Sequence, residues 1–429
     1  MTALRAALDR TLLLMRDELL ANTPDDALLG TLTGTEIAMV ADAATLRAPS
    51  AQTAFVTMAL LCARSGHKVY LVAPDVTLST AQAPLRGTTM IAALMDSDGK
   101  IIPARRFETA PPAHAVDLEI RFGATPQTCA ARARCALGAT RWSGRLTRGT
   151  MQPWMADLVW PMGAMAAATL GAVEAFKCAM HKLADFARDG AQFAEFFAPL
   201  ADTTLVLAPE TVPMVSALGA IDIISGGAMT NGLLYALARL PDVTGVGRVV
   251  EPDIAEMSNL NRYMLLTMDD LEELKAERLA ALALGGLTLK PLPWRFETRD
   301  SIGAFAPRVL VGVDDIPTRW AVQRGMPRYL GIGATTHWSV MASCHRPGAA
   351  CAGCAHPRND AMTGPIPTVA LVSFLAALLQ ATDLLRDLAG TPAAETLTYI
   401  TALRADQVWR APVAEHPNCP VGHGLRLTG

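Results

Sequence analysis

The sequence predicts an α/β fold in which two related halves each contain a mostly parallel sheet covered by helices. The first observation is a strand–turn–helix–strand order between Ala217 and Val250, and the second is the same order between Glu36 and Val72. The third is a composition of 51% hydrophobic but only 5% aromatic residues, typical of an Ala-, Leu- and Val-rich core. A chain of 429 residues suffices for two domains, which we expect to span residues 1–205 and 206–429.

In the second half, the apolar run Ile221–Ile224 enters the tight turn Ser225-Gly226-Gly227. A helical pattern (Leu233–Leu240) and a second strand (Val246–Val250) follow. Glycines let the backbone approach a phosphate, and a helix N-terminus supplies amide donors. The turn lacks the full Gly-x-Gly-x-x-Gly spacing, because Asn231 and Gly232 stand where a third glycine would belong. Taken alone, it is as consistent with a structural turn as with a nucleotide site.

Polar residues behind the second strand favour a nucleotide site over a purely structural turn. Glu251 and Asp253 end that strand and suit ribose hydroxyls, and Asn259, Arg262 and Lys275 follow. A cradle for NAD needs little positive charge here, whereas a triphosphate needs Arg and Lys to offset several negative charges. These residues therefore favour a triphosphate.

A further strand, Arg308–Val313, ends in Asp314-Asp315, with Arg319 behind it. An acid at a strand's carboxyl end, next to a phosphate site, is a natural Mg²⁺ ligand. The alternative for any one of these polar residues is a solvated surface charge. That alternative is weak for all of them together, because they fall at the strand ends of one predicted sheet.

These stretches resemble the adenylation domain of the ubiquitin-activating enzyme superfamily, which includes the thiamine- and molybdopterin-pathway enzymes that adenylate sulfur-carrier proteins. The resemblance covers roughly residues 217–423. It rests on Ser225-Gly226-Gly227-Ala228, Glu251-Pro252-Asp253, Ser258-Asn259-Leu260-Asn261-Arg262, Lys275 and Asp314. It implies that Ser225, Gly226, Gly227, Glu251, Asp253, Asn259, Arg262 and Lys275 bind ATP, that Asp314 binds its Mg²⁺, and that Arg262, Lys275 and Asp314 take part in catalysis. Ser225 in place of the first glycine and Glu251 in place of Asp depart from the family pattern.

The first half repeats the strand, helix, strand and acid order with Glu36–Ala41, Ala51–Ser65, Lys68–Val72 and Asp75. Its turn, residues 42–50, has no glycine, so it cannot bring backbone amides close to phosphates in the same way. We therefore predict two Rossmann-like adenylation-domain repeats, the N-terminal one inactive and the C-terminal one active.

Two long helices support the repeat, one beginning at Pro161 and the other at Pro365, since Pro suits a first helical turn. Ubiquitin-activating enzymes pair an inactive and an active domain in this way, so we predict an intrachain pseudo-dimer. The alternative is two ordinary helices in unrelated domains. In the family, an Arg of the partner domain's N-terminal helix reaches the triphosphate, and Arg5, Arg10 and Arg16 are candidates here.

The cysteines form a second group of candidates. Cys351-Ala-Gly-Cys354 is a knuckle whose small middle residues permit the tight turn of a tetrahedral metal site. Relatives hold structural zinc with two such pairs. Here Cys419 remains from the second pair and His423 would be the fourth ligand, although a site that has lost its metal would look the same. The crossover loop before Pro365 has no cysteine, so Cys344 is the candidate thiol for a thioester, with a buried strand cysteine as the alternative.

The resemblance implies ATP-dependent adenylation of a ubiquitin-like (β-grasp) protein with a C-terminal Gly, followed by transfer to a conjugating enzyme, as in bacterial ubiquitin-like conjugation operons, whose roles include antiviral defence. One alternative is a sulfur-carrier-protein adenylyltransferase, another a peptide adenylyltransferase, and a third a non-catalytic nucleotide-binding scaffold. The net charge of −3 argues against a nucleic-acid partner. The Ala- and Gly-rich stretch 161–180 favours a buried helix over a membrane span. The eight scattered cysteines and the lack of a signal-like segment predict a cytoplasmic protein, as a monomeric pseudo-dimer or a homodimer.

Overall fold

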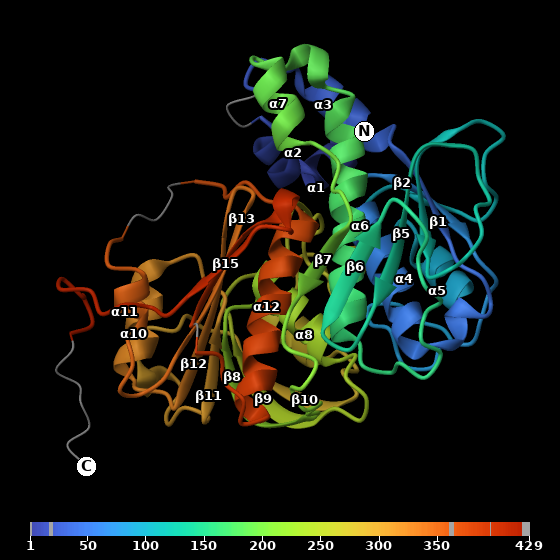
Figure 1. Cartoon of the computed structure of the whole chain (residues 1–429). Coiled ribbons are helices and arrows are strands. Elements are labelled where there is room, and N and C mark those ends of the chain that lie inside the picture. Colours follow the sequence, from blue (N-terminus) through green and yellow to red (C-terminus); the bar gives the residue numbers. More distant parts are fainter. Residues whose placement is uncertain (1, 17–19, 360–363, 395, 423–429) are drawn as a thin grey trace.

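The computed structural model describes residues 2–16, 20–359, 364–394 and 396–422, and it contains two separate sheets (Figure 1). The first half contains α1 (Thr2–Ala7), α2 (Asp9–Met15), α3 (Asp25–Thr33), β1 (Glu36–Val40), α4 (Pro49–Arg64), β2 (Lys68–Val72), α5 (Met90–Ser97), β3 (Phe107–Glu108), β4 (Val116–Phe122), β5 (Ala131–Ala139), β6 (Ser143–Thr147), α6 (Met162–His181), α7 (Gly190–Phe196) and β7 (Thr203–Val206).

The second half contains β8 (Ala217–Ile224), α8 (Ala228–Leu237), β9 (Thr244–Val250), α9 (Lys275–Ala280), β10 (Gly286–Leu292), β11 (Arg308–Val311), α10 (Ile316–Arg324), β12 (Tyr329–Thr336), β13 (Ser339–His345), α11 (Ala352–Ala355), α12 (Ala370–Leu388), β14 (Leu397–Thr401) and β15 (Val408–Ala411). A short 3₁₀ turn, Met257–Asn259, lies between β9 and α9.

The two sheets share one topology over seven strands, and the second sheet has β15 as an additional edge strand. The strand order is β3-β2-β1-β4-β5-β6-β7 in the first and β10-β9-β8-β11-β12-β13-β14-β15 in the second. In each, the strands up to β5 or β12 pair in parallel and the later ones pair antiparallel. The predicted α/β fold with two Rossmann-like repeats is confirmed. Because β7 ends at Val206 and β8 begins at Ala217, the connection between the sheets is residues 207–216.

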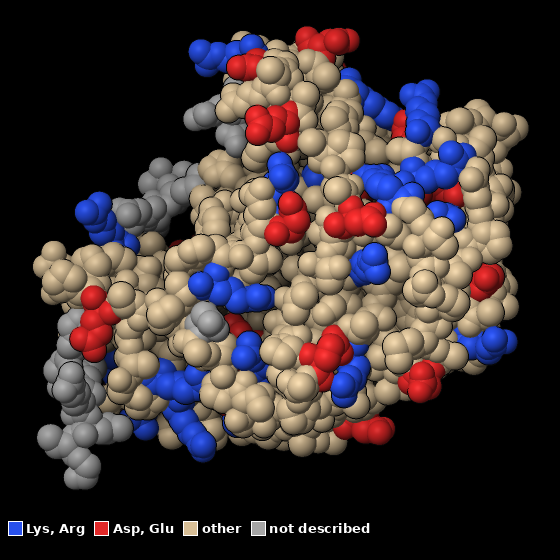
Figure 2. All heavy atoms as spheres, in the orientation of Figure 1, with Lys and Arg blue, Asp and Glu red and all other residues tan. Residues whose placement is uncertain are grey.

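The long helices α6 and α12 pack against each other between the sheets (Figure 1). Their Ala, Leu and Val side chains are almost fully buried, and they join both halves in one apolar core. Glu174 of α6 is buried as well, and it pairs with Arg148 and with Lys177. Among the described helices, none is both long enough and apolar enough to cross a membrane. On the face in Figure 2, acidic and basic side chains are interspersed over both halves.

Several predicted boundaries were wrong. The helix expected from Pro365 begins at Ala370, because Pro367 disfavours helical backbone at Ile366 and Val369 is extended. The N-terminal segment with Arg5, Arg10 and Arg16, expected as one amphipathic helix over residues 1–22, contains the separate helices α1 and α2. The helix expected at Leu233 begins five residues earlier, directly behind the glycine turn. This last difference matters most, because it places the α8 N-terminus against the turn.

In the first half, protein covers the carboxyl ends of the strands. Trp154 packs over Gly123, where an added Cβ would lie 2.9 Å from the Trp154 amide nitrogen. The Trp154 ring donates to Ser50 Oγ (3.0 Å), and the Ser50 amide donates to the Leu158 carbonyl (3.1 Å). The N-terminus of α4 is therefore occupied by the chain itself. Asp75, at the end of β2, accepts from the Ile91 amide (2.8 Å) and caps α5.

Acid should destabilise this fold through buried histidines. Burial lowers the pKa of His67 to about 4, and its Nδ1 lies 3.1 Å from the Leu32 carbonyl. Because this pKa is below the unfolded value, the stabilisation is complete at neutral pH and lost as pH falls through 6.5 toward 4. We expect His67→Asn to remove about 2 kcal/mol of the loss between pH 7 and pH 4.5 in urea unfolding. His181→Asn, at an exposed histidine, should leave that loss unchanged; equal effects would contradict the assignment.

Candidate functional site

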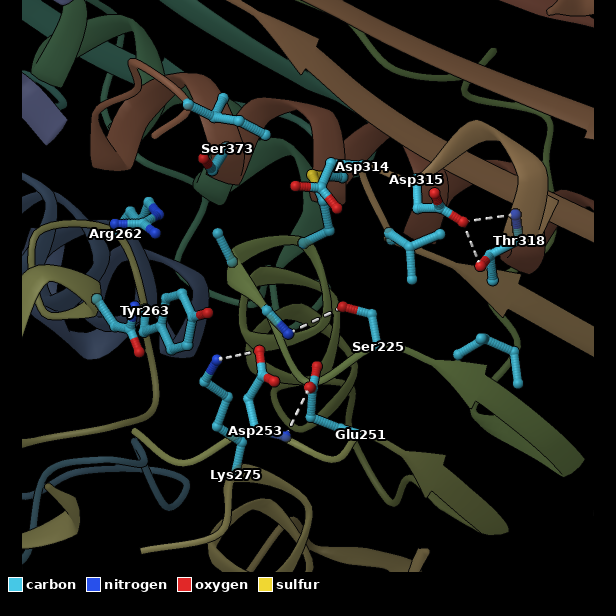
Figure 3. Close-up of a pocket in the computed structure, with 18 of the residues that line it drawn as sticks. Ser225, Glu251, Asp253, Arg262, Tyr263, Lys275, Asp314, Asp315, Thr318 and Ser373 are labelled. Carbon is cyan, nitrogen blue, oxygen red and sulfur yellow. Dashed lines mark hydrogen bonds and ion pairs between the residues drawn. The ribbon is translucent and has the colours of Figure 1, made fainter. Parts of the chain in front are cut away.

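A cavity of about 630 Å³ opens at the carboxyl ends of β8, β9 and β11, beside the N-terminus of α8 (Figure 3). This is the edge of a parallel sheet where the strand order reverses, and ligands of such sheets bind there. All but one of the predicted nucleotide-binding residues line the cavity: Ser225, Gly227, Glu251, Asp253, Asn259, Arg262, Lys275 and Asp314. The structure thus brings together residues that are up to 89 positions apart in the chain.

The glycine turn is held by its own polar side chains. Ser225 Oγ accepts from the Gly227 amide (2.9 Å), and Thr230 donates to the Ser225 carbonyl (2.7 Å). Asn231 is fully buried and donates from Nδ2 to the carbonyls of Gly226 (3.1 Å) and Gly227 (3.0 Å). The residue that departs from the glycine spacing therefore ties the turn to the first turn of α8.

Glu251 links this turn to the end of β9. Its Oε2 accepts from the Gly226 amide (2.5 Å) and its Oε1 from the Asp253 amide (3.0 Å), and burial raises its pKa. An Asp, shorter by one methylene, reaches less far from the same backbone. Gly226 is the predicted residue outside the lining, and an added Cβ there would lie 2.6 Å from Glu251 Cγ, so glycine is required. Glu251 thus shapes the turn as well as bordering the cavity.

Two cations stand on the side opposite the turn (Figure 3). Lys275 Nζ lies 3.2 Å from Asp253 Oδ2, and its side chain is 8% exposed against 67% for Asp253. Burial acts to lower the pKa of Lys275, but Tyr263, Glu251 and Asp253 outweigh it and raise the pKa. Arg262 Nη1 donates to the Ser258 carbonyl (2.5 Å) and to Asn261 Oδ1 (2.9 Å). Burial, and secondarily the nearby Arg10, lower the pKa of Arg262.

Arg10 brings a cation from the first half to the same cavity. It lies on α2 and lines the cavity, and its Nε and Nη1 are buried without a hydrogen-bond partner among the described residues. The other N-terminal candidates do not line the cavity. Arg5 and Arg16 both pair with Asp25 at the start of α3. Two buried donor nitrogens without a partner among the described residues, in a cavity that Arg262 and Lys275 also line, suit an anion.

The acids at the end of β11 have separate positions. Asp315 caps α10 by accepting from the amide (2.8 Å) and hydroxyl (2.5 Å) of Thr318. Asp314 lines the cavity, and no described residue donates a hydrogen bond to its carboxylate. Arg319 donates to the Val313 carbonyl from Nε (3.1 Å) and Nη2 (2.8 Å), which holds the turn between them. Asp314 therefore offers a carboxylate for a divalent cation, since Mg²⁺ prefers such oxygens.

A second part of the cavity was not predicted from the sequence. It is lined by the end of β12 (Gly333, Ala334, Thr335), by Gly364, Pro365, Ile366 and Thr368, and by Ser373 of α12. Small side chains and glycines dominate this lining. Tyr263 and Phe296 also line the cavity and were missed. Tyr263 directly follows Arg262 in the motif, so its position in the cavity could have been predicted from the sequence. The other missed residues line the cavity only because distant segments of the chain pack there.

Cys344 lies outside the cavity. It is 2% exposed, on β13, and burial raises its pKa to about 12, so the thiol is protonated at neutral pH. His345 does not activate it, because the imidazole contacts Ser343 Oγ (3.0 Å) and the Ala350 carbonyl (3.0 Å). This placement corresponds to the buried strand cysteine, the alternative, and gives the thioester assignment of Cys344 no support.

The predicted cysteine cluster comes together. The sulfurs of Cys351, Cys354 and Cys419 all lie within 4.8 Å of one another, with 3.8 Å from Cys351 to Cys354 and 3.3 Å from Cys351 to Cys419. Four thiolates about 2.3 Å from a zinc ion stand about 3.8 Å apart, so the three sulfurs fit such a site. His423 lies outside the described residues. The cluster is separate from the cavity, since none of its cysteines lines it.

Ser225 carries strained backbone that can be tested. Its φ is 134°, a region that favours glycine, and its hydroxyl occupies the Gly227 amide. We expect Ser225→Gly to stabilise the protein by about 1 kcal/mol and to tighten Mg·ATP binding, because it relieves strain and frees an amide donor. Urea unfolding and calorimetry measure the two effects. Ser79→Gly, at an exposed loop serine, is the control, and weaker nucleotide binding by Ser225→Gly would contradict this account.

No family model matches this chain. A curated protein, the uncharacterized protein y4jF of Sinorhizobium fredii (strain NBRC 101917 / NGR234), is 29% identical over 222 residues, which cover 49% of this chain and 40% of that protein. The chain therefore matches less than half the length of this curated relative.

Among solved structures, E. coli MccB crystallised with ATP is 14% identical, with a TM-score of 0.41, covering 67% of this chain and 97% of that chain. The crystal structure of PaaA is 11% identical, with a TM-score of 0.38, covering 46% of this chain and 64% of that one. Likenesses of this size assign no substrate. The structure itself shows a doubled α/β chain with a charged cavity at the strand ends of its second sheet.

Proposed function

We propose that this protein is an ATP-dependent adenylyltransferase that activates the C-terminal carboxylate of a ubiquitin-like (β-grasp) protein ending in Gly. The observation that carries the proposal is the meeting of Arg262, Lys275 and Asp314 with Arg10 of the other half in one cavity. Several cations around a glycine turn, with a carboxylate that accepts no hydrogen bond from a described residue, match the needs of a metal-bound triphosphate. The motif resemblance supplies the nucleotide's identity.

In the proposed reaction, an oxygen of the tail carboxylate forms a bond to the α-phosphorus of ATP. The bond to the bridging oxygen breaks, and pyrophosphate leaves with its electron pair. The chain contributes charge and position rather than a covalent step. Lys275 and Arg262 face the turn and offset the negative charge that grows on the phosphoryl oxygens, and Arg10 does so from the first half. Asp314 would hold a Mg²⁺ ion, and this ion would add positive charge beside the phosphate oxygens.

The second part of the cavity supports a Gly-ending tail as the acceptor. It lies beyond Asp314 and is bordered by Gly333, Ala334 and Gly364. An added Cβ at Gly333 would lie 2.3 Å from Met229 Cε, so a larger residue there would displace the end of the Met229 side chain, which also lines the cavity. This part of the cavity would admit an extended chain without side chains and would place its carboxylate near the residues proposed to bind phosphate.

The first half is proposed to be catalytically inactive. Its strand ends are covered by Trp154, and Asp75, the counterpart of the acid behind β9, caps α5. In this proposal the half acts as a partner domain that supplies Arg10, and the chain works as a monomeric pseudo-dimer. The pathway would be cytoplasmic and of the bacterial conjugation type, with a conjugating enzyme accepting the product. Structural zinc would be held by Cys351, Cys354 and Cys419, with His423 as the fourth ligand.

A second candidate is adenylation without a thioester, as in sulfur-carrier activation. The burial of Cys344 favours it, since a masked thiol cannot accept the adenylated tail. A conjugation pathway would then need a cysteine of the cluster, and a thiol holding zinc is not free for that role.

ATP–pyrophosphate exchange is the direct test. We expect exchange that depends on a β-grasp protein with an intact Gly terminus and disappears when that terminus is deleted. A DTT-sensitive adduct with the same protein would favour the conjugation pathway, and exchange without an adduct would favour sulfur-carrier activation. If the protein binds Mg·ATP but catalyses no exchange with a ubiquitin-like protein or a sulfur-carrier protein, the remaining interpretation is a non-catalytic nucleotide-binding scaffold.

A further inference from the structure

Two buried arginines cross between the halves in a reciprocal arrangement. Arg64 ends α4 in the first half, and Arg239 follows α8, its counterpart in the second. Each is almost completely buried, and each reaches the segment behind the second strand of the opposite half. The helices that carry them meet where Thr57 Oγ1 lies 2.9 Å from Tyr235 Oη.

Arg64 binds backbone carbonyls of the second half. Nη1 donates to the Leu260 carbonyl (2.5 Å), and Nη2 donates to those of Leu266 (2.8 Å) and Met264 (3.4 Å). A fourth carbonyl, of Ile101, accepts from Nη1 at 3.4 Å. No carboxylate of a described residue is paired with this guanidinium, so the carbonyl oxygens alone stabilise its buried charge. Three of these four acceptors belong to residues 260–266, so one planar group fixes the path of that segment.

Arg239 makes the corresponding contacts in the first half. Nη2 donates to the Ala83 carbonyl (2.8 Å) and Nε to Gln82 Oε1 (3.0 Å), while Nη1 returns to the Tyr235 carbonyl (2.9 Å). Residues 82 and 83 follow β2 as residues 260–266 follow β9. The difference lies in what the two segments carry, because neither Gln82 nor Ala83 lines the cavity.

The segment under Arg64 carries the proposed phosphate-binding residues. Asn259 directly precedes Leu260, and Arg262 and Tyr263 stand between Leu260 and Met264; all three line the cavity. Asn261, also fully buried, ties this segment to Thr11 Oγ1 (2.8 Å) and to the Thr368 carbonyl (3.1 Å). A change in the backbone here moves Arg262 relative to Lys275, which stands on α9.

We propose that Arg64 of the first half is a positioning residue for the nucleotide site of the second half, holding the segment 259–266 so that Asn259 and Arg262 face the cavity. This inference rests on the proposed function for its ligand, but not for the contacts. It gives the first half a role beyond Arg10: it builds part of the wall on which the site depends. Without the guanidinium, buried carbonyls lose their hydrogen-bond donors. This loss favours a rearrangement of residues 259–266 that exposes these carbonyls to water.

Arg64→Met and Arg239→Met form a matched pair for the test, because each removes one buried interdomain arginine. Both should lower the thermal midpoint. We expect Arg64→Met to raise amide hydrogen exchange in residues 258–266 and to weaken Mg·ATP binding about tenfold in calorimetry on the full chain. Arg239→Met should raise exchange near residues 80–85 and keep the affinity within about twofold.

A conservative variant separates positioning from folding. Arg64→Lys keeps the charge and part of the carbonyl contacts, so we expect an affinity between those of the parent and Arg64→Met, and it replaces Arg64→Met if that variant does not fold. The inference is overturned if Arg64→Met keeps the parent affinity, or if both methionine variants weaken binding equally. If the unsubstituted protein binds no Mg·ATP, the proposed function fails. Amide hydrogen exchange in residues 258–266 then decides by itself whether Arg64 holds the segment.

Discussion

Asp314→Asn should reduce ATP–pyrophosphate exchange by about 100-fold or more while leaving the fold intact. Asp314 lines the cavity without a hydrogen bond from a described residue, so its carboxylate is free for a cation and its loss leaves no buried partner unsatisfied. Asn has the same shape but no charge and is a much poorer Mg²⁺ ligand. Exchange measured over a range of Mg²⁺ concentrations should show that the variant needs far more of the cation.

Asp269→Asn is the matched control, since Asp269 is exposed and does not line the cavity. It should retain exchange within about twofold of the parent. If Asp314→Asn exchanges at the parent rate at every Mg²⁺ concentration, the cation assignment is wrong and the cavity holds its ligand in another way.

Lys275→Met is the second large effect that we expect, a loss of about 100-fold in exchange. The Lys275 side chain is nearly buried between Asp253 and Tyr263, so its charge acts in a site of low dielectric. Methionine keeps much of the apolar stem but removes the charge that offsets the phosphate oxygens. Asp253 is mostly exposed, so losing its partner costs little stability, and the melting temperature should change by only a few degrees.

Lys290→Met tests whether any lost lysine has this effect, because Lys290 is an exposed residue of β10 outside the cavity. Its exchange rate should equal that of the parent. Calorimetry adds a second measurement: Lys275→Met should also weaken Mg·ATP binding. If Lys275→Met exchanges at the parent rate, Lys275 does not offset the charge of the phosphate oxygens.

The motif residues were found in the sequence because they stand next to strand ends. Asp253 follows β9 and Asp314 follows β11, and parallel strands deliver their carboxyl ends to one edge of a sheet. Local order along the chain was therefore enough to bring Asp253, Asn259, Lys275 and Asp314 into one region. The geometry of the glycine turn was harder to predict. The hydrogen bond from Asn231 to the Gly226 carbonyl requires that α8 begin at Ala228, five residues before its apolar pattern becomes regular.

Other residues could not be assigned from local order. Arg10 was one of three equivalent arginines until the pairing of Arg5 and Arg16 with Asp25 set it apart. Cys344 was a candidate thiol until its burial under α12 masked it. In both cases the deciding contact comes from a segment far away in the chain, and neither periodicity nor spacing encodes such a contact.

The sequence by itself determined the doubled α/β plan, the strand whose end carries each acid, and the set of charged residues at the second sheet's edge. Hydrophobic periodicity and turn residues act over a few positions, so they specify such features directly. Only the tertiary structure decided that Arg10 of the first half lines the cavity, that Arg64 binds carbonyls of residues 260–266, and that small residues line the cavity beyond Asp314. Those outcomes depend on how two sheets and their helices pack, and packing is a property of the whole chain.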